Sequence, residues 1–529
     1  MKSIREIMLV IALASITTSC SDSPDPDHTR AESDRTEPAP LIVLGLDGAD
    51  WGVIEELIAD GEMPHIARMV EEGAYGHLLN PGPQVSPVVW TTFATGHFGR
   101  QHGILDFVYP YVEGAKRPVD STLRREPALW NLTAAAGKTA TVIGYFVSHP
   151  AEPIQGRVVT DRAFQGLDES VWPRSLAESV EGHRREAMSE SAALISDFLG
   201  WQYSPDQADE PSSPRGKAAV LIKDRVDQRI VADEFLRRVT MDLLDQPGDL
   251  FISYFRIIDI VSHSLWFYHD PTDWDEPPSP EMKALLGETV SDAYRYADRI
   301  VGAILDRFAD RANIVIISDH GFGSATGRFA TGPENRMLTG NHRPNGVFMA
   351  HGPDILPGRV DGLTIMEIMP TLAMLLGVSI ADTLPGEIAL EVLDPAFVEA
   401  RPPTFVENYV LDWQDTRSST VDSESQREAM KSLQGLGYIG EGVQLAEGDN
   451  TETYDFWAAE PNLIAQSLHG EIAYYLLKND LSAAEAVVGD LRRNKPALLV
   501  NTLARAAQKI QTLKKEVPNA EKLAPELEA

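Results

Sequence analysis

The strongest constraint on the fold comes from apolar runs that stop abruptly at polar residues. Asn313–Ile317 contains four consecutive apolar, mostly β-branched residues, and Asp319, His320 and Gly321 follow closely. Such a run is typical of a strand buried on both faces of a parallel sheet. Open α/β sheets carry their chemistry outside the carboxyl ends of the strands, so Asp319 and His320 are candidate metal ligands. They could instead form a turn, with Asp319 as a helix cap and Gly321 at positive φ.

Other predicted strands end in the same kind of residue. Leu41–Leu46 is a second buried run, and Asp47 comes directly after it. A third strand, Leu250–Phe255, is followed by Asp259 and His263, four residues apart. If a helix begins there, this spacing puts both side chains on one face, as two ligands of one ion require. The alternatives are a turn or cap for Asp47 and a solvent-facing position for His263.

Ser86 precedes Pro87 at the start of a predicted helix. Proline is tolerated in the first turn, and serine is a good helix cap. A hydroxyl at a helix N-terminus is also placed where a developing anion finds free N–H groups. Capping and nucleophilic attack by Ser86 therefore predict the same local geometry.

Composition limits the class of partner. The chain has 529 residues, more than one hydrophobic core usually supports, and a net charge of −33. This charge argues against a nucleic acid polymer as partner, because phosphate backbones are bound by basic surfaces. Small phosphorylated substrates remain possible, since bound metal ions reverse the local field.

The N-terminus predicts export. Residues 1–19 combine Lys2 and Arg5 with the short apolar run Ile7–Ile16, which is too short for a membrane span and typical of a signal peptide. Cys20 is the only cysteine, and its position resembles that of the lipidated cysteine of a bacterial lipoprotein. The alternative is ordinary secretion. Residues 20–40 are rich in Asp, Ser and Pro and predict a disordered tether.

In chain order, these motifs resemble the ligand series of the alkaline phosphatase superfamily. The likeness is closest to its type I phosphodiesterase/nucleotide pyrophosphatase branch and to predicted phosphohydrolases or phosphomutases related to cofactor-independent phosphoglycerate mutase. It spans roughly residues 41–390 and rests on Asp47, Ser86, Asp259, His263, Asp319, His320 and His342.

The resemblance implies a role for each of these residues. One divalent ion would be held by Asp259, His263 and His342, and a second by Asp47, Asp319 and His320. Ser86 would be a further ligand of the second ion and also the nucleophile, and would form a phospho-serine intermediate. The family usually holds two Zn²⁺ ions, although relatives of the mutase type can use Mn²⁺. His269 is a further candidate ligand with no assigned role.

The resemblance also implies an α/β fold with a mostly parallel central sheet and helices on both faces. We expect a catalytic domain over residues 41–425, a helical insertion over 161–245 with long charged helices such as 217–244, and a C-terminal helical region over 426–529. Residues 464–510 come near the spacing of one tetratricopeptide-type helix pair, but a helical cap on the main domain is the preferred interpretation.

The sequence differs from the motifs of related families at two points that concern the choice of substrate. Nucleotide pyrophosphatases typically have a Thr nucleophile and, three residues later, an Asn that contacts the phosphoryl oxygen, whereas this chain has Ser86 and Val89. The Arg of the sulfatase motif is absent after Ser86. We therefore expect an exported hydrolase that cleaves a small phosphodiester or phosphonate, with a phosphomonoester as the next candidate. The lipid anchor would be its only contact with the membrane. A phosphomutase or phosphotransferase and an inactive metal-containing surface binding protein are the alternatives.

Overall fold

A computed structural model describes residues 38–166, 168–325, 339–410, 423–435, 443–446 and 454–516. The predicted signal peptide, Cys20 and nearly all of the predicted tether lie outside these residues. None of the described helices has an apolar stretch long enough to cross a membrane.

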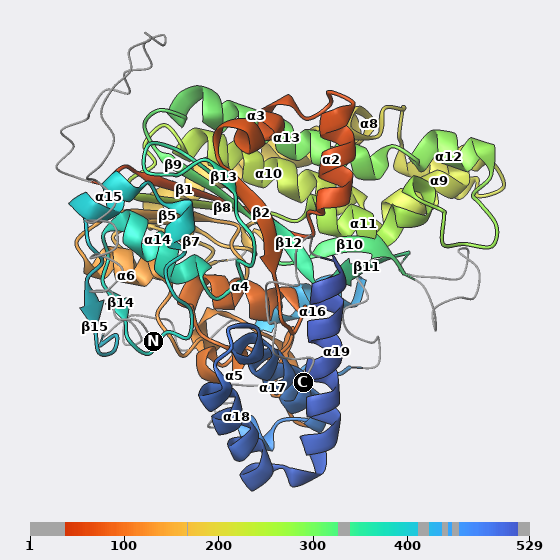
Figure 1. The fold of residues 1–529 in the computed structure, drawn as a ribbon. Coiled ribbons are helices and arrows are strands. Elements are labelled where there is room, and N and C mark those ends of the chain that lie inside the picture. The colour runs from red at the N-terminus through yellow and green to blue at the C-terminus, as the bar shows by residue number, and fades with distance from the viewer. Residues whose placement is uncertain are drawn as a thin grey trace, which may run out of the picture. The chain divides into compact units, whose positions relative to one another are not determined.

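The core of the fold is a nine-stranded, mostly parallel sheet (Figure 1). Two of the nine strands run antiparallel to their neighbours: β12, which lies between β2 and β9, and β7, which pairs with β6. In spatial order the strands are β13 (Gly358–Arg359), β2 (Ala74–Leu79), β12 (Asn345–His351), β9 (Asn313–Ile317), β1 (Leu41–Leu46), β8 (Leu250–Phe255), β5 (Ala140–Ile143), β6 (Gly156–Val159) and β7 (Val171–Trp172). The three strands predicted from apolar runs are thus the adjacent central strands β9, β1 and β8.

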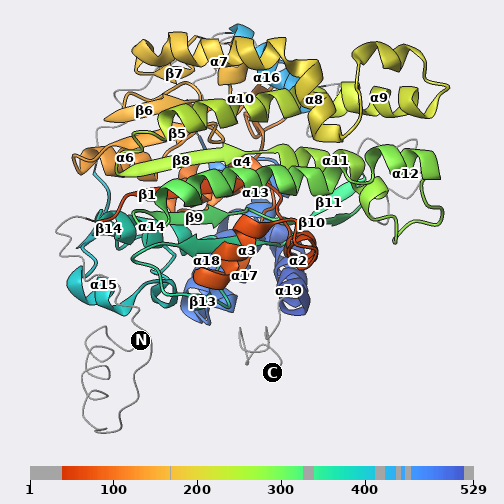
Figure 2. The same ribbon diagram turned by 90° about the horizontal axis from the view of Figure 1, so that it is seen from above.

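Helices cover both faces of this sheet, which confirms the predicted α/β architecture (Figures 1 and 2). Successive residues of β1 alternate between two apolar clusters, with Ile42 and Leu44 on one face and Leu41 and Val43 on the other. The first face packs against α2 (Trp51–Ala59), α3 (Pro64–Glu72), α10 (Asp227–Leu243), α11 (Ile257–His269) and α13 (Thr289–Phe308). The second packs against α4 (Ser86–Thr95), α6 (Leu129–Ala135) and α14 (Ile368–Leu376).

The register of the central strands brings their carboxyl ends together. Leu41 to Gly45 of β1 lie opposite Asn313 to Ile317 of β9, and Leu46 lies opposite Phe255 of β8. The residues that follow these three strands therefore meet at one edge of the sheet.

The region expected to be a helical insertion differs in detail from the prediction. It contains α7 (Ala177–Ser189), α8 (Ser191–Leu199), α9 (Pro214–Arg225) and α10. The predicted continuous helix over 217–244 is wrong, because it is interrupted at Val226, whose φ is −124° and whose side chain is fully buried. The adjacent Asp227 accepts a hydrogen bond from the buried hydroxyl of Tyr203, so tertiary packing sets the break.

The remaining helices and strands lie outside the nine-stranded sheet. They are α5 (Gly99–His102), β3 (Val108–Tyr109), β4 (Arg117–Pro118), α12 (Pro280–Leu286), β10 (Gly321–Ser324), β11 (Gly340–Arg343), β14 (Ile380–Ala381), α15 (Pro395–Ala400), β15 (Phe405–Val406), α16 (Ser423–Gly435), α17 (Pro461–Leu477), α18 (Leu481–Asn494) and α19 (Leu499–Glu516).

Helices α17, α18 and α19 share an apolar cluster with Leu79, at the end of β2, and Ile104, in the loop after α5. Arg100 of α5 also donates to both carboxylate oxygens of Glu471 on α17, at 2.6 and 2.7 Å. The Glu471 side chain is only 1% exposed. The C-terminal helices are thus attached to the sheet domain by apolar burial and a partly buried ion pair.

Candidate metal centre

Two groups of potential ligands converge at the carboxyl ends of β1, β9 and β8. Ligand atoms of Asp47, Asp319 and His320 lie within 4.8 Å of one another, and so do those of Asp259, His320 and His342. The first group is the set predicted to hold one ion. A backbone hydrogen bond connects the two groups, because the Asp259 amide donates to the Asp47 carbonyl at 3.1 Å.

His263 completes the set predicted for the other ion. It lies one turn after Asp259 on α11, and its Nε2 is 3.3 Å from Asp259 Oδ1 and 2.8 Å from His342 Nε2. His342 belongs to β11, which pairs with β10 in a separate two-stranded sheet. The structure thus brings together all six predicted ligand side chains, and His320 bridges the two sets. Its Nε2 is 3.4 Å from Asp47 Oδ1 and 3.8 Å from Asp259 Oδ1.

Hydrogen bonds to backbone carbonyls orient the three histidines. The Nδ1 atoms of His263, His320 and His342 lie 3.2, 3.1 and 3.2 Å from the carbonyl oxygens of Gly340, Gly321 and Gln84, respectively. A carbonyl oxygen only accepts, so each Nδ1 carries a hydrogen and donates it, which leaves each Nε2 facing the carboxylates of the cluster. This is the arrangement by which proteins orient histidine ligands of a metal ion.

The two carboxylates at the strand ends are held at one oxygen each. Tyr254 of β8 donates to Asp47 Oδ2, and the Gly48 amide donates to Asp319 Oδ1 at 3.4 Å. Within the described part of the chain, Asp47 Oδ1, Asp319 Oδ2 and His320 Nε2 are buried and form no hydrogen bond. Buried polar atoms without a partner are costly, and a divalent cation would satisfy all three. The donor set of histidine and carboxylate therefore fits a metal centre.

Electrostatics support the same conclusion. Burial, together with the neighbouring Asp47 carboxylate, raises the pKa of Asp319 well above its ordinary value. Burial lowers the pKa of His320, but the carboxylates of Asp319, Asp47 and Asp259 outweigh it and raise that pKa to about 10. Without a metal ion, this pocket thus retains protons, and cations that bind there would displace them.

In the second ligand set, the pKa values of Asp259 and His342 are lowered rather than raised. Burial raises the pKa of Asp259, but His263 and His342 outweigh it and hold that pKa well below its usual range. Burial and the nearby His320 lower the pKa of His342 to about 4. At neutral pH Asp259 is therefore ionised and His342 is neutral, which are the forms that bind metal ions.

Ser86 is the first residue of α4, and its side chain is 1% exposed. The N-cap position belongs to Val85, whose carbonyl accepts from the amides of Val88 and Val89. Ser86 Oγ is buried and forms no hydrogen bond to any described residue, so its hydroxyl does not act as a cap. Two residues earlier, the Gln84 carbonyl binds His342, which ties the segment before Ser86 to the ligand cluster.

The alternative interpretation of Asp319 and Gly321, a helix cap and a turn glycine at positive φ, does not hold. Asp319 caps no described helix, because β10 begins at Gly321, and Gly321 does not have a positive φ. A side chain at Gly321 would instead collide with the Asp50 carboxylate and the Asn345 carbonyl, which a Cβ would approach to 2.4 and 2.5 Å. Close packing is the reason for glycine at this position.

Sequence patterns missed two supporting residues. Tyr254, the partner of Asp47, occupies an apolar strand and resembles an ordinary core residue. Asn80 follows β2, a strand that the sequence did not indicate, and its amide donates to the Asp319 carbonyl at 2.9 Å. His269, the unassigned candidate, lies at the end of α11 and belongs to neither ligand group among the described residues.

Comparison with known proteins gives a family. The model of the type I phosphodiesterase/nucleotide pyrophosphatase family matches residues 41–337, more than half of the chain. No curated protein matches.

Similar solved structures include murine ectonucleotide pyrophosphatase/phosphodiesterase 5, as an inactive variant in complex with AMP. It has 12% identity and a TM-score of 0.37, with 67% of this chain and 100% of that chain covered. Another is phosphonoacetate hydrolase from Sinorhizobium meliloti in complex with phosphonoformate. It has 17% identity and a TM-score of 0.33, with 55% of this chain and 58% of that chain covered. The family match, rather than these distant structures, decides the assignment.

Proposed function

This chain belongs to the type I phosphodiesterase/nucleotide pyrophosphatase family and is a phosphoric ester hydrolase, and we propose that it acts through Ser86 and two divalent metal ions. The substrate would be a small phosphodiester or phosphonate, with a phosphomonoester as the next candidate. The ions would be Zn²⁺, or alternatively Mn²⁺, since histidine and carboxylate ligands suit both.

The observation that carries the proposal is the orientation of the three histidines, whose Nδ1 atoms all bind backbone carbonyls. Asp259, His263 and His342 would hold one ion, and Asp47, Asp319 and His320 the other. When bound, the ions would supply positive charge to the phosphoryl group and favour the ionised form of a nearby hydroxyl. Stabilising the negative charge on the phosphoryl oxygens is the main requirement of phosphoryl transfer.

Ser86 is suited to attack because its buried hydroxyl is not engaged in a hydrogen bond within the described residues. Its oxygen, after giving up the hydroxyl proton to water, would form a bond to phosphorus while the bond from phosphorus to the leaving oxygen breaks, and the leaving oxygen would take up a proton from water. Its position at the N-terminus of α4 also favours the negative charge that develops there. Water would then cleave the phospho-serine, returning Ser86 to its hydroxyl form and releasing the phosphoryl group.

The proposal includes export and anchoring through a lipid on Cys20, with cleavage of the signal peptide before that residue. The isolated cysteine after a short apolar segment supports it. Metabolic labelling with a radioactive fatty acid tests it, because the label would be incorporated by the native chain and lost in Cys20→Ala. Labelling that persists in Cys20→Ala would exclude Cys20 as the lipidated residue.

Metal analysis combined with a substrate screen tests the enzymatic proposal. The metal-loaded protein is assayed on aryl phosphodiester, phosphonate ester, phosphomonoester and sulfate substrates. We expect two metal equivalents and highest activity on a phosphodiester or phosphonate ester. Metal-loaded protein that is inactive on all four substrates would favour the surface binding alternative. Transfer of the phosphoryl group to an added alcohol in preference to water would favour the phosphotransferase.

A further inference from the structure

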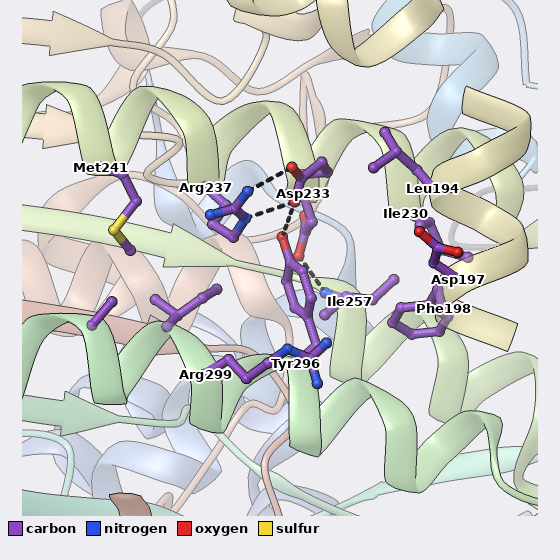
Figure 3. Close-up of a pocket in the computed structure, with 13 residues that line it drawn as sticks. Leu194, Asp197, Phe198, Ile230, Asp233, Arg237, Met241, Ile257, Tyr296 and Arg299 are labelled. Carbon is purple, nitrogen blue, oxygen red and sulfur yellow. Dashed lines mark hydrogen bonds and ion pairs between the residues drawn. The ribbon is translucent and has the colours of Figure 1, made fainter. Parts of the chain in front are cut away.

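A cavity of about 300 Å³ lies within the helical layer on one face of the sheet. Side chains of α8, α10 and α13, together with the first residue of α11, line it (Figure 3). Much of its wall is apolar, with Phe198, Ile230, Ile257 and Ile300 among the lining residues. None of the residues assigned to the metal centre lines this cavity, so it is a separate feature of the fold.

Asp233 places a buried carboxylate in the wall of the cavity, and its side chain is only 2% exposed. Its Oδ2 accepts hydrogen bonds from the amides of Arg256 and Ile257, at 2.9 and 2.8 Å, at the N-terminus of α11. Its Oδ1 has no hydrogen-bond partner in the described part of the chain. One oxygen thus holds the helix start, and the other is left for a ligand.

The other charges around the cavity do not neutralise Asp233. Glu234 is paired with Arg237, at 2.7 Å to each carboxylate oxygen, and accepts a hydrogen bond from the Tyr296 hydroxyl at 3.2 Å. Arg299 is exposed and stacks over the ring of Tyr296, 5.8 Å from its centre.

Two further charged groups lie nearby. Asp197 is exposed. Arg256 acts on Asp233 through its charge, while its guanidinium donates to the Asp161 carbonyl at 3.4 Å. Burial nevertheless raises the pKa of Asp233 to about 6, despite Arg256 and the two amides. At neutral pH the cavity therefore contains an ionised carboxylate whose burial is only partly compensated.

We propose that this cavity binds a small organic cation, an alkylammonium whose nitrogen donates to Asp233 Oδ1 and whose hydrocarbon part packs against Phe198, Ile230 and Ile300. A metal ion would need several oxygen or nitrogen ligands, and Asp233 is the one buried carboxylate on the cavity wall that is not already ion-paired within the described residues. An apolar wall with one charged group instead matches an amphipathic amine.

Calorimetric titration of the full-length, metal-loaded protein with n-hexylammonium, n-hexanol and hexanoate at pH 8 tests this proposal. We expect saturable binding of the ammonium, and binding of the alcohol and the carboxylate at least about tenfold weaker, because a hydrogen bond to a charged group contributes about that factor or more. Equal affinity for the alcohol would overturn the proposal, as would the absence of saturable ammonium binding at millimolar concentrations.

Asp233→Asn is the most direct variant, since its amide oxygen can still accept from Arg256 and Ile257 while the charge is removed. We expect its affinity for hexylammonium to fall about tenfold or more. Asp197→Asn, which removes an exposed charge at the same cavity, is the matched control and should leave the affinity unchanged. Unchanged affinity in a folded Asp233→Asn would contradict the proposal.

A second variant covers the case in which Asp233→Asn does not fold. Ala303 lines the cavity on α13 and is half-buried, so Ala303→Phe fills the space without altering Asp233. We expect this variant to lose hexylammonium binding, with Ala303→Ser as the control that retains it. Binding that persists in Ala303→Phe would place the ammonium elsewhere.

Discussion

Asp47 and Asp319 follow adjacent parallel strands, and the amide of Gly48 donates across the gap between them to Asp319 Oδ1 at 3.4 Å. Neither carboxylate is more than 2% exposed. Two buried carboxylates repel each other unless a proton or a cation lies between them. Here protons are retained on Asp319 and His320, whose pKa values are both raised. The stability of the metal-free protein should therefore depend on pH.

We expect the metal-free protein to lose stability as the pH rises from about 6.5 to about 10. His320 has an ordinary pKa of 6.5 and a folded-state pKa of about 10, so the folded state binds this proton more tightly than the unfolded state. The resulting stabilisation is complete below pH 6.5 and is lost as the pH rises toward 10, by up to about 1.4 kcal/mol per pH unit. Asp319 acts in the same direction.

Chemical denaturation of chelator-treated protein across this pH range measures the effect. Metal-loaded protein is the control, since bound ions replace the protons and should flatten the dependence. A metal-free protein whose stability rises with pH over this interval would contradict the assignment of the cluster.

Tyr254→Phe removes the hydroxyl that donates to Asp47 Oδ2. Partners that orient a metal ligand typically contribute a factor of about 10 to 100 to metal affinity, and we expect a loss of that size in a competition titration. Tyr145→Phe is the matched control, because Tyr145 packs in the same aromatic cluster but donates to the Trp90 carbonyl. Equal metal affinities in the two variants would show that the hydroxyl of Tyr254 does not support the ligand.

Much of the fold could be predicted from the sequence because the central strands consist mainly of apolar residues. Strands β1, β8 and β9 are mostly apolar and are buried on both faces, a pattern that local sequence indicates. By contrast, β10 and β11 are short and contain glycine and polar residues, so their local sequence does not indicate that they form a pair of strands. The break at Val226 likewise depends on burial, which helical periodicity does not reveal.

In the candidate site, too, some residues could be predicted from local sequence and others depend on tertiary packing. Residues within two positions of the end of a predicted strand, such as Asp47 and Asp319, could be selected because parallel strands end at one edge of a sheet. Tyr254 could not, since an aromatic residue in an apolar strand usually packs in the core. The bridging position of His320 depends on the stacking of its ring on His342, 3.5 Å away, which no sequence pattern encodes. The chemical roles of these residues stay predictions.

Gln84 is the candidate for the phosphoryl contact that an Asn makes in nucleotide pyrophosphatases. Val89, at the position of that Asn, is buried in the apolar cluster beneath the sheet, whereas the buried Gln84 Nε2 has no hydrogen-bond partner among the described residues. We expect Gln84→Ala to lower kcat about a hundredfold, as loss of a donor to a developing oxyanion does. Its metal content should not change, because only the backbone of Gln84 binds His342. Gln155→Ala, on the surface, is the control, and equal kcat values in the two variants would exclude this role.

Gly470 of α17 supports the loop that leads to Ser86. A Cβ at Gly470 would lie 2.2 Å from the Gly82 carbonyl oxygen, and the Gly82 amide is itself bound to Asn80. We expect Gly470→Ala to displace this loop and to lower kcat on the order of tenfold, because small displacements of reacting groups are costly. Metal content should stay the same.

Gly489→Ala on α18 is the matched control, since its Cβ would meet only the Arg493 guanidinium, at 3.3 Å. It should gain helix stability and keep full activity. Normal kcat in Gly470→Ala would show that α17 does not position the Ser86 loop.

The most direct test of the two-metal mechanism is the steady-state activity of metal-loaded Ser86→Ala, with metal content measured on the same sample. We expect both metal equivalents to be retained and kcat to fall about a thousandfold or more, as on removal of a catalytic nucleophile. Ser86→Thr, which restores a hydroxyl of the family's usual kind, should recover part of the activity. Undiminished kcat in Ser86→Ala at full metal content would contradict the assignment of Ser86 as the nucleophile.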